Sequence, residues 1–273
     1  MQTWAFDCEW APDLKAGRRL YHLPDDVPDD EVLRVMWEQG GATPETPQPF
    51  LKTVMCRLVS IAAVVRNEKG DLVLWAIPSL GEIPGQPFVD DASVDERSIL
   101  EAFLARYEKN LGIPGKEPVL VGYNSRNADV HILLQRALVN GMQLRGFARE
   151  AAAKPWNQTG VDLMDLVGGH GKGHTCSLNE IAVLCGIPGK LDTTGDDVAG
   201  LYYGGRRRKI VEYNVFDALT TYLLWLRVEY FCARLTDTEY DREQDKVRAL
   251  LAEESAKPHG KFLKMYVEAW NAL

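Results

Sequence analysis

Residues 4–10 combine the alternation of a β-strand with two closely spaced acids. Aromatic and apolar residues flank the acids and Pro12 closes the run, which favours a strand. Side chains alternate faces along a strand, so Asp7 and Glu9 should point one way and Cys8 the other. Two neighbouring carboxylates in so apolar a segment repel each other and resist burial unless a proton or a cation compensates them. The pattern therefore indicates either an exposed strand end with solvated acids or a divalent-metal site, since hard cations take carboxylate oxygens.

The composition is typical of an ordinary soluble globular protein. The 273 residues are 46% hydrophobic and 26% charged, enough for one large domain or two small ones. The sequence has neither an apolar run long enough to span a bilayer nor an N-terminal signal pattern, so we expect no membrane association and a cytoplasmic location. The net charge of −8 is not typical of a nucleic-acid-binding protein, but carboxylate metal ligands would themselves make a chain acidic. Five scattered cysteines predict reduced thiols: Cys8, Cys56, Cys176, Cys185 and Cys232.

The order of the predicted elements is that of one α/β domain with a mixed sheet. A long polar stretch, 11–53, follows the first strand and is predicted to be an insertion or lid with a short helix at 31–39. Capping-box spacing marks two helix starts, Ser93 with Glu96 and Ser177 with Glu180. The other predicted strands are 57–66, 71–77, 119–124 and 160–166, and the other predicted helices are 93–111, 128–140, 177–185, 196–201, 206–235, 237–255 and 261–270.

Two further acids fall where they could complete a site with the acids of the first strand. Asp129 begins the helix that follows the inner strand 119–124. The helix dipole alone could favour an acid at this position. However, α/β sheets place ligands at the carboxyl ends of their strands. Asp217 lies four residues after Tyr213 on the long helix, and therefore on the same face. An aspartate in that apolar stripe needs a partner, and a metal shared with Asp7 would be one.

Three segments, in this order, resemble the exonuclease motifs of the DEDD (DnaQ-like) 3′–5′ exonuclease superfamily. They are Phe6-Asp7-Cys8-Glu9, then Gly122-Tyr123-Asn124 with Asn127-Ala128-Asp129, then Tyr213-Asn214-Val215-Phe216-Asp217. The tyrosine of the last segment resembles the DEDDy subgroup. The stretches 161–166, 177–190 and 212–224 resemble the stand-alone predicted exonucleases related to the proofreading domain of family B DNA polymerases.

The resemblance implies a ribonuclease H-like fold, an α/β architecture with a mixed five-stranded sheet flanked by helices. We expect residues 1–235 to form the exonuclease domain, with an N-terminal insertion at about 11–53. The remaining residues, 236–273, are expected to be a helical C-terminal extension packed on the same domain.

The resemblance also implies how five residues would share the chemistry of a two-metal phosphodiesterase. In such sites two ions, here Mg²⁺ or Mn²⁺, lie about 3.5–4 Å apart and clamp the attacking and leaving oxygens. Asp7 would bridge both ions. Glu9 and Asp217 would complete the ion that activates water, and Asp129 would help to hold the ion at the leaving group. Tyr213 would orient the water, because a hydroxyl with an ordinary pKa of about 10 is a poor base.

The implied substrate is the 3′ end of a single-stranded nucleic acid, with DNA as the first choice and nucleoside 5′-monophosphates as products. Asn124 and the backbone near Cys8 would contact the terminal nucleotide, and Lys190 is a candidate phosphate contact. Two residues depart from those usual in the family, Ala128 in place of an aromatic residue and Trp10 in place of threonine. Both departures alter the seat of the terminal nucleotide without removing a metal ligand.

Two alternative functions stay open at this point. The same fold could carry a 3′–5′ exoribonuclease, because the 2′-OH is sensed by contacts that a sequence does not place. A non-catalytic module binding nucleic acid or a protein is the other, although the intact set of acids argues against it. We expect any polymerase or repair partner to act in trans, and the sequence gives no oligomeric state.

Three further features have competing interpretations. Four potential zinc ligands lie near one another, but their spacing matches no common zinc pattern: His170, His174, Cys176 and Cys185. The basic run 206–209 could grip a nucleic-acid backbone or be a solvated helix start. Trp156 and the pair Tyr202-Tyr203 could stack on bases or pack in the core.

Overall fold

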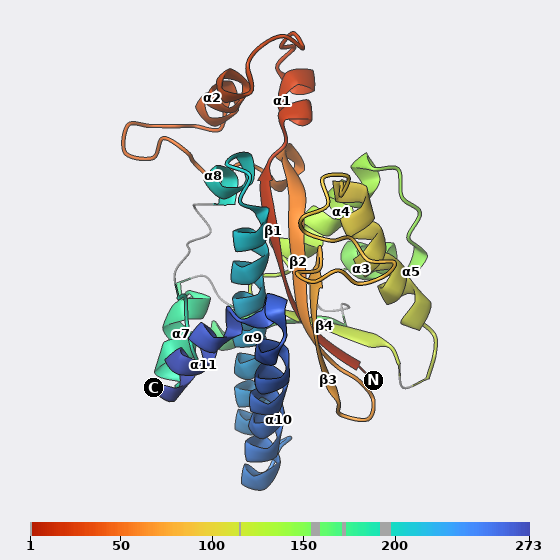
Figure 1. Cartoon of the computed structure of the whole chain (residues 1–273), viewed down its shortest axis with the longest axis vertical. Helices are drawn as coiled ribbons and strands as arrows, with labels where there is room; N and C mark the ends of the chain where they lie inside the picture. The colour runs from red at the N-terminus through yellow and green to blue at the C-terminus, as the bar shows by residue number, and fades with distance from the viewer. Residues whose placement is uncertain (1, 115, 154–158, 171–172, 192–197) are drawn as a thin grey trace.

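The computed structural model describes residues 2–114, 116–153, 159–170, 173–191 and 198–273. At its centre is a five-stranded mixed sheet in the order β3-β2-β1-β4-β5 (Figure 1). The strands are β1 (Gln2–Pro12), β2 (Cys56–Arg66), β3 (Leu72–Ile77), β4 (Pro118–Gly122) and β5 (Val161–Asp162). β1 pairs antiparallel with β2 and parallel with β4, which makes it the central strand. The predicted α/β fold with a mixed five-stranded sheet is confirmed.

Helices cover both faces of the sheet (Figure 1). On one face lie α3 (Glu96–Asn110), α4 (Asp129–Val139) and α5 (Arg145–Ala152). On the other lie α9 (Arg207–Phe231), α10 (Asp237–Ala256) and α11 (Leu263–Asn271). The shorter helices are α1 (Leu14–Leu20), α2 (Asp29–Gln39), α6 (Leu163–Val167), α7 (Leu178–Leu184) and α8 (Val198–Tyr203), with 3₁₀ turns at η1 (Thr53–Met55) and η4 (Pro258–Gly260).

The alternation of β1 builds two separate cores. Trp4, Phe6 and Cys8 are buried in the cluster shared with α3 and α4, whereas Ala5 is buried in the cluster shared with α9. Burying each large side chain of this kind contributes about 1.5–3 kcal/mol, so the register of β1 is strongly fixed. Asp7 and Glu9 have the same parity as Ala5. They therefore face α9, as the strand pattern predicts.

The C-terminal helices pack on the same core as α9. Side chains from both helices are buried there, among them Val247 of α10 and Tyr266 of α11. Arg66 of β2 also donates two hydrogen bonds of 3.0 Å to Glu243 of α10. No helix in the described residues is long and apolar enough to cross a membrane.

The two predicted capping boxes have different outcomes. Ser177 and Glu180 form theirs at the start of α7. The box predicted for Ser93 and Glu96 is wrong, because α3 begins at Glu96 and is capped by Asp95. Glu96 points into the protein, where it binds a buried arginine instead of the helix start.

The segment between β1 and β2 contains more structure than the sequence predicts. The predicted short helix corresponds to α2, but α1 was not expected, and neither was α5 further along the chain. α1 approaches α2 at Gly17, where an added Cβ would lie 2.5 Å from the Met36 sulfur. Both helices project beyond the end of the sheet (Figure 1). The predicted strand 160–166 is also too long, because Asp162 caps α6 and ends β5 after two residues.

Candidate active site

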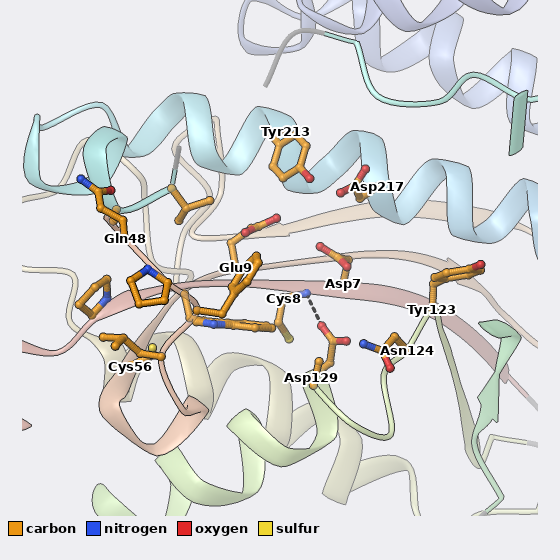
Figure 2. Close-up of a pocket in the computed structure, with 18 of the residues that line it drawn as sticks. Asp7, Cys8, Glu9, Gln48, Cys56, Tyr123, Asn124, Asp129, Tyr213 and Asp217 are labelled. Carbon is orange, nitrogen blue, oxygen red and sulfur yellow. Dashed lines mark hydrogen bonds between the residues drawn. The ribbon is translucent and has the colours of Figure 1, made fainter. Parts of the chain in front are cut away.

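A cleft of about 370 Å³ opens beside the carboxyl end of β4, between β1, α4 and α9 (Figure 2). Its volume falls within the roughly 300–1,000 Å³ that is typical of ligand sites. All nine residues selected from the sequence line it: Asp7, Cys8, Glu9, Trp10, Asn124, Asp129, Lys190, Tyr213 and Asp217. Segments that are far apart in the chain therefore meet at one place, as the three-motif pattern predicts.

Three carboxylates form the centre of the cleft. Asp7 and Glu9 from β1 and Asp217 from α9 each offer one oxygen, and these oxygens lie within 4.8 Å of one another. Figure 2 shows the Asp7 and Asp217 carboxylates facing a common space below the ring of Tyr213. A single divalent cation could contact all three, since carboxylate oxygens bind such ions at about 2.0–2.6 Å.

The same three acids are poorly compensated. Burial, followed by the charges of neighbouring acids, holds the pKa of Asp7 and of Glu9 well above the usual range. Burial raises the pKa of Asp217 to about 6, against the opposing effects of Tyr213 and Lys190. Lys190 is the one basic side chain among the described residues that line the cleft. Without a further cation, these acids hold their protons to a higher pH than ordinary carboxyls do.

Asp129 lies apart from this trio, on the α4 side of β1. Its Oδ1 accepts a hydrogen bond of 2.9 Å from the backbone N–H of Cys8 (Figure 2). That N–H is free because the pairing of β1 with β4 ends at Ala5. Burial raises the pKa of Asp129 to about 7, although the bond from Cys8 acts to lower it. Asp129 is thus fixed at the cleft by the strand that carries Asp7.

Asn214, which the sequence shows only as part of the third motif, supports Asp7. Asn214 of α9 is fully buried and donates a hydrogen bond of 2.6 Å from Nδ2 to Asp7 Oδ2. Its Oδ1 accepts a bond of 2.9 Å from the hydroxyl of Ser60, also fully buried, on β2. This chain fixes one oxygen of Asp7. A polar residue in the apolar stripe of the long helix was the signal that could have identified Asn214.

Tyr213 and Lys190 flank the acids. Tyr213 is buried, and burial together with the charges of Asp217 and Glu9 raises the pKa of its hydroxyl well above the usual range. The hydroxyl stays protonated and can donate a hydrogen bond, which agrees with an orienting role. The backbone N–H of Lys190 donates to the Asn179 side chain at 2.8 Å, which anchors the chain at that residue.

The turn after β4 forms the other end of the cleft. Asn124 has a φ of 58°, a left-handed conformation that asparagine tolerates better than most residues. The backbone N–H groups of Asn124 and Arg126 each donate to the Asp162 carboxylate at 2.9 Å. Asp162 therefore shapes this turn, and the sequence marked it only as part of a strand. The side-chain Nδ2 of Asn127 donates a hydrogen bond of 3.1 Å to Oδ1 of Asn124.

The competing sequence features have structural explanations where they are described. Among the described residues, Asp7, Glu9 and Asp217 form the one group of three or more potential metal ligands that come together, so no three of the four potential zinc ligands do so. In the basic run, Arg208 pairs with Asp90, and Arg207 contacts the ring of Tyr202. Tyr203 donates a bond of 2.5 Å to the carbonyl of Pro12. Trp156 lies outside the described residues.

The fold is that of a polymerase exonuclease domain of the ribonuclease H-like type. The structure is similar to that of the family B DNA polymerase from the hyperthermophilic archaeon Pyrobaculum calidifontis, with a TM-score of 0.51 and 16% sequence identity. The match covers 94% of this chain but 29% of the polymerase chain. At this identity the likeness concerns the fold.

Sequence comparison defines the family. Residues 48–270 match the model of a family described as predicted 3′–5′ exonucleases related to the exonuclease domain of PolB. This chain belongs to that family. A comparison with curated proteins gives no match. The matched range begins after Asp7 and Glu9, so the argument for these two acids depends on the geometry of the cleft.

Proposed function

We propose that this exonuclease is metal-dependent and removes nucleotides from the 3′ end of single-stranded nucleic acid, with DNA as the first substrate to test. The observation that carries the proposal is the convergence of Asp7, Glu9 and Asp217 within 4.8 Å, with Tyr213 beside them. The order and identity of these residues also support assignment to the DEDDy subgroup.

The donor set fits divalent cations. All three acids offer hard carboxylate oxygens, and their raised pKa values reflect a site that lacks compensating charge. Mg²⁺ or Mn²⁺ matches such ligands better than zinc, which more often takes histidine or cysteine. Asp7, Glu9 and Asp217 would hold one ion, and Asp7 with Asp129 would hold a second. When bound, such ions activate water and the scissile phosphate for hydrolysis.

The protein itself supplies orientation. Asn214 restrains Oδ2 of Asp7, and the Cys8 N–H restrains Asp129, so the carboxylates meet the substrate in a fixed arrangement. Tyr213, as a protonated hydroxyl, can direct the attacking water by a hydrogen bond. Lys190 is suited to a phosphate oxygen, because it is the basic side chain of the described cleft lining. Hydrolysis adds water across the P–O bond, releasing a nucleoside 5′-monophosphate and a new 3′-hydroxyl.

The test is a cleavage assay with 5′-labelled single-stranded DNA and a matched RNA. Mg²⁺ or Mn²⁺ should produce a ladder that shortens from the 3′ end, and EDTA or Asp7→Ala should abolish it. If the RNA is shortened faster than the DNA, RNA is the preferred substrate. Binding of either strand without cleavage, by a folded protein in both metals, would favour a non-catalytic binding module.

We also propose that residues 1–235 and the helices of 236–273 act as one unit. The shared burial of α9, α10 and α11 supports this division, in which the C-terminal helices extend the exonuclease domain.

A further inference from the structure

One wall of the cleft comes from the segment between β1 and β2. Trp37 of α2 lines the cleft together with the run Gln48, Pro49, Phe50 and Leu51. The match to the exonuclease family begins at residue 48, so Trp37 and both helices of the insertion lie outside it. An element that the family match does not include therefore contributes directly to the candidate active site.

The cleft is chemically asymmetric along its length. Gln48 and Cys56 lie at one end, Tyr123 and Asn124 at the other, and the acids between them (Figure 2). The insertion contributes the large apolar side chains Trp37 and Phe50 to the lining. The acids are expected to contact the scissile phosphate through metal ions. The apolar side chains of the insertion are therefore suited to contact the faces of the bases.

Phe50 differs from an ordinary core residue. Its side chain is 82% exposed although it lines the cleft, whereas the adjacent Leu51 packs on the buried clusters around Phe103 and Met36. The Leu51 side chain also lies against Gly40, where an added Cβ would be 2.6 Å from Leu51 Cδ2. Leu51 thus anchors the chain at this point, and the exposed ring of the neighbouring Phe50 is available at the cleft.

The insertion is held rigidly at its root. Asp13 accepts a hydrogen bond of 2.7 Å from buried Arg136, and its backbone N–H donates to Met55 at 2.8 Å. Arg18 of α1 donates to the carbonyl of Val27 at 2.7 Å, which ties α1 to the start of α2. These bonds fix the root of the insertion and the approach to α2, which reduces the ordering that the insertion needs when a strand binds.

From this arrangement we propose that Trp37 and Phe50 stack on unpaired bases next to the scissile phosphate, so that the insertion selects single-stranded 3′ ends. Aromatic side chains stack on any base, which gives affinity without sequence preference. A base inside a duplex already stacks on its neighbours and must leave them to reach these two side chains. Lys190 is also the sole cation of the described lining, which is too few to follow a duplex backbone.

This inference rests on the proposed function, and the experiment separates the two. Steady-state cleavage is measured on two DNA substrates of equal length, one with an unpaired 3′ end and one with a blunt paired end. The wild type should prefer the unpaired end. Phe50→Ala should raise the KM for the unpaired end about fivefold or more, given the stacking energy of about 1–3 kcal/mol per base. It should also reduce the ratio of cleavage rates between the unpaired and the paired end. Phe50→Tyr should restore both.

A fluorescence signal reports stacking directly. The fluorescence of an oligonucleotide with 2-aminopurine near its 3′ end should decrease on binding, in a stopped-flow phase that precedes cleavage. This decrease should be absent with Phe50→Ala. Phe231→Ala is the matched control, because Phe231 is also 82% exposed but lies at the end of α9 and does not line the cleft. It should behave as the wild type.

The outcomes are distinguishable. A wild type that cleaves DNA while Phe50→Ala keeps the same KM, end preference and 2-aminopurine signal would overturn the inference and leave the proposed function standing. A wild type that neither cleaves nor binds either substrate would overturn the proposed function, and the inference with it.

Discussion

Buried carboxylates occur on both faces of the central sheet, but the two groups differ in how their charge is balanced. On the α3 and α4 face, Arg136 donates to Glu96 at 2.6 and 2.7 Å and to Asp13 at 2.7 Å. Asn140 and the backbone N–H of Leu58 complete the bonding of Glu96. On the α9 face, Glu9 and Asp217 have Lys190 nearby and still have raised pKa values, and Asp129 of the same cleft, on the α4 side of β1, also has a raised pKa. We call Glu96 and Asp13 the balanced group and the acids of the cleft the unbalanced group.

The difference distinguishes carboxylates that serve the fold from those that serve a ligand. A buried carboxylate is stable as an ion only when a cation and hydrogen bonds compensate it. Without them its pKa rises, and it takes up a proton or binds a cation from outside the protein. The Arg136 network satisfies its acids internally and joins α3, α4 and the root of the insertion. The cleft supplies hydrogen bonds to its acids but leaves their charge uncompensated, which is the expected state of a site for cations.

The largest expected effect on stability is at the balanced group. Arg136→Met should lower the free energy of unfolding by about 3–5 kcal/mol, because it leaves Glu96 and Asp13 buried without their cation. Urea unfolding monitored by circular dichroism measures the change.

Arg34→Ala is the control for losing an arginine with two acidic partners. Arg34 pairs with Glu31 and Glu38 on the exposed surface of α2, where water screens the charges. This variant should be indistinguishable from the wild type. If Arg136→Met also left the free energy of unfolding unchanged, the proposed distinction between the balanced and the unbalanced acids would be wrong.

The unbalanced group should show itself in the pH dependence of the metal-free protein. Asp217 and Asp129 have pKa values of about 6 and 7 in the fold, above their ordinary value of 3.8, so the folded state binds more protons than the unfolded state. Their contribution is complete at low pH and is lost as the pH rises through these values. Stability should therefore fall by about 4 kcal/mol between pH 5 and 7.5, because the two groups together account for roughly three pKa units over this window at 1.36 kcal/mol per unit.

Metal should reverse that loss. At pH 7.5, Mg²⁺ or Mn²⁺ should raise the melting temperature, because the ions bind the ionised acids of the folded state. Asp217→Asn should flatten the pH profile and weaken the metal effect. The interpretation fails if thermal scans show metal-free stability constant or rising over this window. Carboxyls with lowered pKa, such as Glu243, titrate at lower pH and do not interfere.

Hydrophobic periodicity and residue spacing predicted the central architecture, because the faces of strands and helices are determined by local sequence. The alternation of β1 placed Asp7 and Glu9 on one face, and the four-residue spacing placed Asp217 beneath Tyr213. What the sequence could not show was which partner each polar group finds in space. Glu96 has ideal spacing for a capping box, but a buried arginine 40 residues away binds it instead.

The supporting residues were missed for the same reason. Asn214 and Ser60 are 154 residues apart in the chain and meet only because α9 packs across β2. The insertion, similarly, reads as a polar stretch with a short helix. Its contribution to the cleft depends on the tertiary placement of Trp37 and Phe50 in the cleft lining, which local pattern does not encode.

The smallest expected effect concerns the neutral side-chain hydrogen bond that supports Asp7 within the cleft. Asn214→Ala removes the donor to Asp7 Oδ2, so one carboxylate oxygen can rotate away from its metal-binding position. Loss of such supporting contacts typically costs about 10–100-fold in metal affinity or activity. Titrating activity against Mn²⁺ should show a weaker apparent affinity for the ion, measured per folded molecule.

Ser60→Ala tests whether the support acts as a chain. Ser60 touches Asn214 and not Asp7, so its removal should shift the Mn²⁺ dependence in the same direction but by less. If both residues act only by orienting Asp7, the double variant should be no worse than Asn214→Ala alone, since the second link has nothing left to hold. Additive losses would mean that Ser60 supports the site by another route. Non-additive losses would show that even the uncompensated acids of the cleft depend on a neutral hydrogen-bond chain, which orients Asp7 without supplying the charge that a cation must bring.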